Sequence, residues 1–326
     1  MIEGPVLVTG GAGYIGSVLV RQLLRKVLEV RVADSLRSGG ESLLELIEEK
    51  NFHFHKVDVR DRSQMVDIMK GCRSVVHLAA IVGDPACKNE PELAVDTNVS
   101  ASKRLYEIAN EAKCGRFVFA STCSNYGKMP DPDLFMTEES PLSPVSLYAE
   151  TKVDFEKYLL GQSKDNTCKP TCLRFSTVYG HSPRIRFDLT VNEFTKDLFL
   201  GRELEVYGEQ FWRPYGHVTD LARSIVLVLE SPPEKVAHEV FNVGDTGENY
   251  TKKMLVEEIR KVIPGTKVKY VRKQEDPRDY KVGFEKIRSK LGFRISKRVP
   301  DGISEVVEVL RMGLLSNPDD RKYYNS

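Results

Sequence analysis

A tyrosine and a lysine stand four residues apart in the segment "SLYAETK", as Tyr148 and Lys152. On a helix, this spacing places both side chains on one face. A free tyrosine has a pKa of about 10, and a neighbouring ammonium group favours its phenolate. The pair is therefore a candidate general base, and the lysine can also hydrogen-bond a ribose and position a cofactor.

A second group of side chains follows an apolar run in "RFVFASTCSNYG". Its hydroxyls belong to Ser121, Thr122 and Ser124. In a parallel α/β sheet, ligands bind at the carboxyl ends of the strands. A hydroxyl there can hydrogen-bond a substrate oxygen.

Four glycines interrupt the chain between the first strand-like run and the first helical pattern, at Gly10, Gly11, Gly13 and Gly16. They fit the dinucleotide pattern G-x-G-x-x-G and the wider G-x-x-G-x-x-G. Glycine permits a sharp turn and lets the backbone approach a pyrophosphate, which the helix N-terminus then binds.

The second strand ends at Asp34, about 20 residues beyond the glycines, where a carboxylate binds the adenosine ribose. This carboxylate would repel a 2′-phosphate, so NAD is expected rather than NADP. Arg37, just beyond it, is the residue type that can accept such a phosphate. Asp58, at the end of the third strand, is either an adenine contact or a helix cap.

These residues must be positioned by elements that alternate between apolar strands and amphipathic helices, including one helical pattern from Glu92 to Lys113. This order predicts right-handed crossovers and a Rossmann-type, doubly wound parallel sheet. We expect a dinucleotide-binding domain over residues 1–180, with a returning strand near 238–245. Residues 181–326 are expected to form a smaller, discontinuous α/β substrate domain, with a hairpin-like stretch over 204–218.

Composition excludes several classes of partner. The chain has 326 residues and a formal net charge of +1, so no strong field attracts nucleic acid or a membrane surface. No apolar run approaches the roughly 20 residues of a membrane helix. The six cysteines show no zinc-like spacing and indicate a reducing, cytoplasmic setting.

Several motifs in this order resemble the extended short-chain dehydrogenase/reductase superfamily, and more narrowly its NAD-dependent sugar-nucleotide epimerase/dehydratase branch. They are "TGGAGYIGS", "HLAA", "STCSNYG", "YAETK", "LRFSTVYG", "FWRPYGHVTDLA" and "FNVG". The resemblance covers nearly the whole chain. It implies that Tyr148 is the base, that Lys152 holds the cofactor and that Thr122 holds the substrate carbonyl oxygen.

The resemblance also assigns ligand contacts. It implies cofactor contacts from Gly10, Gly13, Tyr14, Ile15, Gly16, Asp34, Asp58, Val59, Leu78, Ala79, Ala80, Asn98, Tyr148, Lys152, Phe175 and Val178. The substrate, a nucleotide-diphosphate sugar, would contact Thr122, Asn192, Arg213 and Arg278. The arginines would grip its diphosphate, because a guanidinium binds phosphate oxygens in pairs.

The chain departs from the branch at three places. The dehydratases carry Asp-Glu where this chain has Cys123 and Ser124, although a thiol of lowered pKa could still act as an acid–base group. His181 stands one residue from the position of an acid–base histidine in some relatives, and a plain loop histidine is the alternative. The loop "IVGDPACKNEPEL" indicates a substrate other than a common UDP-hexose.

The favoured activity is an epimerase that passes through a transient keto sugar and regenerates its NAD. The alternatives are a dehydratase that uses Cys123, a reductase that consumes NAD(P)H, and an inactive relative that binds NAD as a regulatory ligand. The resemblance also implies a homodimer, formed by helices around residues 98–113 and 148–161.

Overall fold

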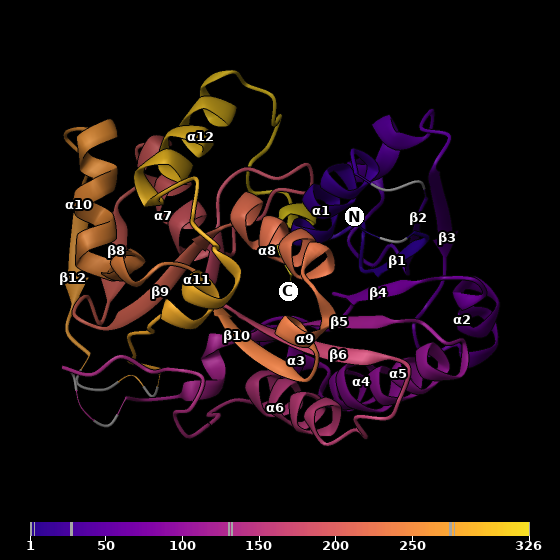
Figure 1. Cartoon of the computed structure of the whole chain (residues 1–326). Helices are drawn as coiled ribbons and strands as arrows, with labels where there is room; N and C mark the ends of the chain where they lie inside the picture. Colours follow the sequence, from indigo (N-terminus) through magenta and orange to yellow (C-terminus); the bar gives the residue numbers. More distant parts are fainter. Residues whose placement is uncertain are drawn as a thin grey trace.

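The computed structural model describes residues 2, 4–26, 29–129, 131, 133–273, 276 and 278–325. Its centre is a seven-stranded parallel sheet in the order β3-β2-β1-β4-β5-β6-β10 (Figure 1). This is the doubly wound Rossmann order, so the predicted fold class is confirmed. The strands are β1 (Val6–Thr9), β2 (Val30–Asp34), β3 (Phe52–Lys56), β4 (Ser74–His77), β5 (Arg116–Thr122), β6 (Lys169–Phe175) and β10 (Glu239–Val243).

Each face of this sheet is covered by helices and has its own apolar core. Successive strand residues point to opposite faces, so Val118 of β5 joins one core and Phe117 and Phe119 join the other. The first core contains α1 (Tyr14–Leu24) and α8 (Val218–Glu230). The second contains α2 (Arg62–Met69), α5 (Ser102–Glu111) and α6 (Leu147–Leu160).

The single helix expected from Glu92 to Lys113 is divided in the structure. It consists of α4 (Pro91–Val95), a π-helical turn over Asp96–Ala101, and α5. Such turns often occur at functional sites, because the extra residue re-aims a side chain. Asn98 lies in this turn.

The later part of the chain builds smaller elements beside the main sheet. A three-stranded sheet has the order β11-β9-β7, and β8 pairs with β12. The strands are β7 (Thr177–Tyr179), β8 (Leu204–Tyr207), β9 (Trp212–His217), β11 (Asn249–Thr251) and β12 (Val268–Val271). The helices here are α7 (Thr190–Phe199), α9 (Pro233–Val236), α10 (Lys252–Val262), α11 (Glu285–Leu291) and α12 (Val299–Arg311).

The expected hairpin over residues 204–218 is wrong. Its two strands, β8 and β9, belong to different sheets. Leu204 and Val206 alternate toward a core that they share with α10 and α12, so β8 pairs with β12 there. Strand β9 instead pairs with β7 and β11.

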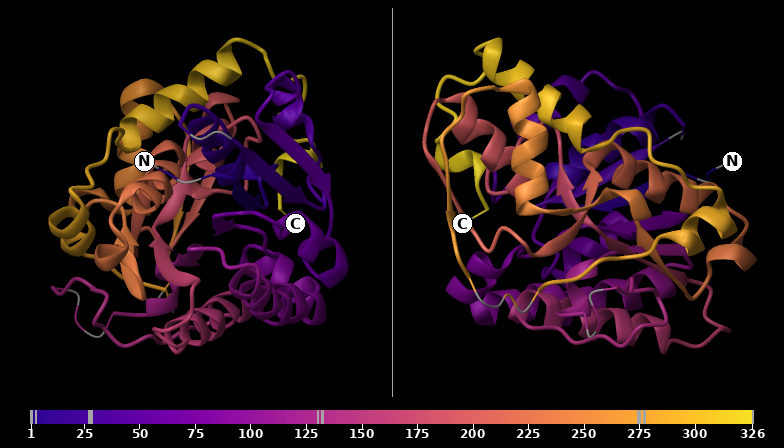
Figure 2. Two further views of the ribbon diagram at one scale, coloured as in Figure 1. Left: turned by 45° about the vertical axis from the view of Figure 1, so that its right-hand side comes forward. Right: turned by 90° about the vertical axis from the view of Figure 1, so that its left-hand side faces the viewer.

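Short helical segments complete the chain: α3 (Asp84–Asn89) and 3₁₀ turns over Glu41–Leu46, Cys123–Tyr126, Thr246–Glu248 and Arg321–Tyr323. The left view of Figure 2 shows α12 running from the later elements toward the first third of the chain. Strand β10 returns to pair with β6, although the division into two domains stays a prediction. Among the described helices, none is long and apolar enough to cross a membrane.

Candidate active site

The glycine turn connects β1 to α1 with very little space around it. Gly10 has a φ of +74°, and a Cβ atom on it would lie 2.7 Å from the backbone nitrogen of Ala79. Helix α1 begins at Tyr14, and Gly13 at its N-cap provides no side-chain cap. The N-terminus of α1 can therefore receive a diphosphate, because its first N–H groups lack a side-chain acceptor at the cap.

Asp34 is fixed at the end of β2, beside this turn. Its carboxylate accepts hydrogen bonds from the backbone nitrogens of Ala12, at 3.0 Å, and Leu36, at 2.8 Å. Burial raises its pKa. Arg37 forms an ion pair with Glu90, so its charge already has a partner. The turn and the carboxylate together fit NAD.

The cofactor contacts expected from Asp58, Val59 and Ile15 stay predictions. Asp58 lies between β3 and α2 and pairs with Arg60 at 2.8 Å, and this hydrogen bonding lowers the pKa of Asp58. Val59 is buried in the core beneath α2. The backbone around Ile15 belongs to the first turn of α1.

Lys152 connects helix α6 to strand β5. Its Nζ donates to the carbonyl of Ala120 at 2.9 Å and lies 5.9 Å from the ring centre of Tyr148. The side chain is buried, and burial lowers the pKa of Lys152 to about 8. Ala120 stands two residues before Thr122 at the end of β5, so Lys152 connects α6 to the strand that carries Thr122.

The hydroxyls of Thr122 and Tyr148 face different electrostatic environments. Thr122 Oγ1 accepts a hydrogen bond from the backbone nitrogen of Ser124 at 3.1 Å, which leaves its own proton available to a substrate oxygen. Burial raises the pKa of Tyr148, while the charge of Arg186 acts to lower it. A base at this position therefore depends on nearby positive charge.

Arg186 is a residue that the sequence reasoning missed. It is buried, and its guanidinium lies 6.0 Å from the ring centre of Tyr14 and pairs with Asp188 at 2.5 Å. The repeated arginines in "RIRF" were the available signal, but only the fold brings this loop toward Tyr148.

Asn98 holds the loop after β4. Its Oδ1 accepts from the nitrogen of Ile81 at 2.8 Å, and its Nδ2 donates to the oxygen of Ile81 at 3.0 Å and to Thr151 Oγ1 at 3.2 Å. The π-helical turn makes this reach possible. The amide thus positions the segment of Leu78, Ala79 and Ala80 against α6, and a direct contact of Asn98 with the cofactor stays a prediction.

Phe175 and Val178 flank the junction between β6 and β7. Phe175 is buried and Val178 is half-buried, and both pack in or against the core shared with α1 and α8. Their proposed contact with the nicotinamide stays a prediction.

Cys123 does not have the environment of an acid–base group. It is 1% exposed, and its Sγ donates to the backbone oxygen of Arg174 at 3.2 Å. Burial raises its pKa, which opposes formation of the thiolate. This corrects the expectation of a reactive thiol, because the side chain points into the core.

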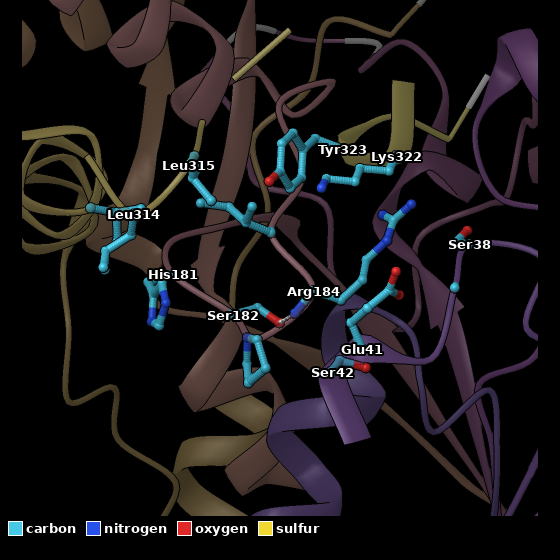
Figure 3. A pocket seen from close by; sticks show the side chains of 14 residues that line it. Ser38, Glu41, Ser42, His181, Ser182, Arg184, Leu314, Leu315, Lys322 and Tyr323 are labelled. Carbon is cyan, nitrogen blue, oxygen red and sulfur yellow. Dashed lines mark hydrogen bonds between the residues drawn. The ribbon is translucent and has the colours of Figure 1, made fainter. Parts of the chain in front are cut away.

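Asn192 is also corrected, whereas the acid–base role of His181 stays a prediction. The side chain of His181 lines a pocket beside Ser182 and Leu314 (Figure 3). Asn192 is fully buried, with Oδ1 accepting from Gly180 N at 2.9 Å and Nδ2 donating to Arg186 O at 2.9 Å. Its amide holds the loop after β7 and has no free group for a substrate.

The two arginines assigned to the substrate diphosphate come together. Arg213 pairs with Asp276 at 3.1 Å and lies 5.3 Å from the ring centre of Tyr280. Arg278 pairs with Asp84 at 2.5 Å. Asp84 begins α3 within the unusual segment "IVGDPAC", so this segment contacts Arg278 directly.

The parallel sheet, the glycine turn with Asp34, and the Thr122, Tyr148 and Lys152 group define a dinucleotide-dependent enzyme site of the Rossmann class. The chain belongs to the NAD dependent epimerase/dehydratase family, whose sequence profile matches residues 6–244. The expected family and its cofactor, NAD, are thereby confirmed.

Individual relatives include both activities of this family. The chain is 32% identical to a dTDP-glucose 4,6-dehydratase of Streptomyces niveus, over 94% of this chain and 92% of that protein. It is 29% identical to a UDP-glucose 4-epimerase of Lactobacillus helveticus, over 89% and 91%. The crystal structure of the dTDP-glucose 4,6-dehydratase DesIV of Streptomyces venezuelae with NAD bound superposes with a TM-score of 0.84, at 28% identity over 98% of each chain.

Proposed function

We propose that this enzyme is an NAD-dependent epimerase of a nucleotide-diphosphate sugar and acts through a transient keto sugar. One observation carries the proposal: Lys152 is packed beside Tyr148 and hydrogen-bonded to β5, two residues before Thr122. The family relatives act on nucleotide sugars, which supports the substrate class.

In this reaction, Tyr148 removes the proton from a sugar hydroxyl, and the buried ammonium of Lys152 stabilises the resulting phenolate. The hydroxyl of Thr122 donates to the oxygen that becomes the ketone. When bound, NAD would supply the hydride acceptor and donor for this chemistry. Tyr148 returns its proton to the sugar oxygen, and the carbon is inverted because it takes the hydride back on its opposite face.

Two alternative reactions differ in what they require. Dehydration needs an acid and a base next to the ketone, and the buried Cys123 supplies neither. Ser124, the next residue, has an alcohol 3.4 Å from the hydroxyl of Tyr280 and no charge. This favours epimerisation. A reductase would need free NAD(P)H for every turnover.

Binding of the substrate diphosphate would use Arg213 and Arg278. Each of them is paired with a carboxylate, Asp276 or Asp84, so an incoming diphosphate must compete with these acids. The competition is possible because a diphosphate offers several charged oxygens to each guanidinium.

The test is incubation of the purified enzyme with a panel of nucleotide-diphosphate sugars, without added cofactor, followed by NMR. We expect conversion of one sugar to its epimer, with Cys123→Ala retaining most of the turnover. A dehydrated 4-keto product that disappears in Cys123→Ala would establish the dehydratase instead. A product formed only with added NADH would establish the reductase.

A further inference from the structure

A second pocket lies beside the dinucleotide site. Its walls are the loop after β2, with Ser38, Gly39 and Ser42, and the loop after β7, from His181 to Ile185 (Figure 3). The C-terminal segment closes it with Leu314, Leu315, Lys322 and Tyr323. The cavity is about 230 Å³, large enough for part of a nucleotide.

Arg184 extends into this pocket with an incomplete set of partners. Its residue is 8% exposed, and its Nε is buried without a hydrogen-bond acceptor. Figure 3 shows the guanidinium between Glu41 and Lys322. Its Nη2 donates to the backbone oxygen of Tyr324 at 3.3 Å, but across the described residues no carboxylate forms an ion pair with it.

Asp188 and Asp34 act on Arg184 through their charges, but a buried cation without a directly paired anion is still costly, so this position favours binding of one. Burial lowers the pKa of Arg184 to about 10, which leaves the group charged near neutral pH. The neighbouring Arg186 already uses Asp188 as its partner. Of the charged groups that line the pocket, Lys322 adds to the positive charge, and Glu41 is exposed at the rim.

Two serines in the walls of this pocket form hydrogen bonds to the backbone of the glycine turn and the start of α1. Ser42 Oγ donates to the backbone oxygen of Ala12 at 2.8 Å, and Ser182 Oγ donates to that of Tyr14 at 2.7 Å. The loop that supplies Ser38 begins directly after Asp34, the carboxylate for the ribose. The pocket therefore opens beside the adenosine end of the cofactor site.

We propose that this pocket binds a phosphate group carried by a nucleotide, with Arg184 as its main contact. The planar guanidinium can bind two phosphate oxygens at once, and the ammonium of Lys322 can approach a third. The phosphate belongs either to the bound dinucleotide or to a separate nucleotide. This inference does not depend on the proposed epimerase reaction.

The test compares the wild-type holoenzyme with Arg184→Met and with Arg311→Met, a control at an exposed arginine of α12. The NAD content per chain is measured after heat release. The thermal shift of each holoenzyme is measured with AMP, inorganic phosphate and sodium chloride at equal ionic strength.

If the phosphate belongs to the dinucleotide, Arg184→Met weakens NAD binding about tenfold or more, and its NAD content falls. If it belongs to a separate nucleotide, NAD content is unchanged, and AMP stabilises the wild type and Arg311→Met but not Arg184→Met. Unchanged NAD content together with the same response to AMP in all three proteins, including no response, would overturn the proposal.

Two further variants apply if Arg184→Met does not fold. Arg184→Lys keeps the charge but loses the planar guanidinium that can bind two phosphate oxygens. Lys322→Met changes a side chain that is 53% exposed. Each variant is expected to reduce the affinity for NAD, or for AMP if the phosphate belongs to a separate nucleotide, about threefold or more. Wild-type affinity for NAD and for AMP in both variants would overturn the proposal in this case.

Discussion

Lys152 carries its charge in a buried position, with the carbonyl of Ala120 as its hydrogen-bond acceptor. Tyr148, one turn before it, has a hydroxyl whose pKa is raised by the same burial. Burial therefore removes water from both groups. Their close packing lets the ammonium of Lys152 stabilise the phenolate of Tyr148, which a separated pair could not do.

Removal of the Tyr148 hydroxyl is expected to abolish turnover without unfolding the protein. We expect Tyr148→Phe to lower kcat by about a thousandfold or more, because the loss of a general base costs about 10²–10⁴ in rate. Its melting temperature should stay within a few degrees of the wild type. The assay is conversion of the identified nucleotide sugar, followed by NMR.

Tyr158→Phe is the matched control, since Tyr158 lies on the same helix and its hydroxyl donates to the surface residue Glu107. This variant should keep wild-type turnover. Full activity of Tyr148→Phe would contradict the assigned base.

The buried charge of Lys152 is expected to make stability depend on pH. In the protein without NAD, burial lowers its pKa from 10.5 to about 8. Below pH 8 the folded and unfolded states are both charged, and the full penalty, up to about 3 kcal/mol, is present. Between pH 8 and 10.5 the folded state loses its proton first, so the penalty disappears as the pH rises.

Lys152→Met lacks this penalty, although it leaves Ala120 O without its donor. At pH 7 the variant should be more stable than the wild type, and its advantage should shrink as the pH rises toward 10. Urea unfolding of both NAD-free proteins at pH 7 and 9.5 measures this difference. An advantage that is the same at both pH values would contradict the assigned burial of the charge.

At the scale of the elements, the β1–α1 unit combines tight packing with ligand binding. Gly16 lies against the glycine turn, so that a Cβ atom on it would come 2.7 Å from the Cα of Gly11 and closer still to the oxygen of Gly10. Gly16 must therefore lack a side chain if α1 is to stay close to the turn and its N–H groups are to face the cofactor.

Gly16→Ala is expected to move α1 away from the turn. Overpacking of this kind costs about 1–3 kcal/mol, and we expect a lower NAD content and a lower melting temperature. NAD released per chain and thermal unfolding are the measurements. Gly115→Ala is the control, because the nearest atom to its new Cβ lies 3.7 Å away. Equal NAD content in both variants would contradict the role of Gly16.

At the scale of the whole molecule, an apolar surface lies next to the helices around residues 98–113 and 148–161 that are expected to form a homodimer. Val95 of α4 is 42% exposed and lines a shallow groove with Pro91, Ser100 and Leu147. The groove lies at the start of α6 and beside the π-helical turn. We propose that a second copy of the chain covers it.

A charge in this groove should separate the copies. We expect the wild type to elute as a dimer and the double variant Val95→Lys/Ser100→Lys as a monomer, as measured by size-exclusion chromatography with light scattering. Val262→Lys, at a 37% exposed valine of α10, should remain dimeric. A wild-type monomer, or a dimer that survives the double substitution, would contradict this interface.

The sequence by itself determined the features that rest on local pattern. Strand–helix alternation predicted the parallel sheet, and the spacing of the glycines, Asp34, Tyr148 and Lys152 predicted where a dinucleotide and a base would lie. These features can be recognised in the sequence because each is encoded in a short stretch of chain, by its hydrophobic period or by the spacing of a few residues.

Only the tertiary structure decided which polar side chains are free to act. Cys123, Asn98 and Asn192 are hydrogen-bonded in the interior, and the buried Nε of Arg184 has no hydrogen-bond acceptor among the described residues. Burial and hydrogen-bond partners come from segments distant in sequence, such as Arg174 for Cys123 and Ile81 for Asn98. No local pattern contains that information, because the same residue types suit a reactive site and a satisfied core equally well.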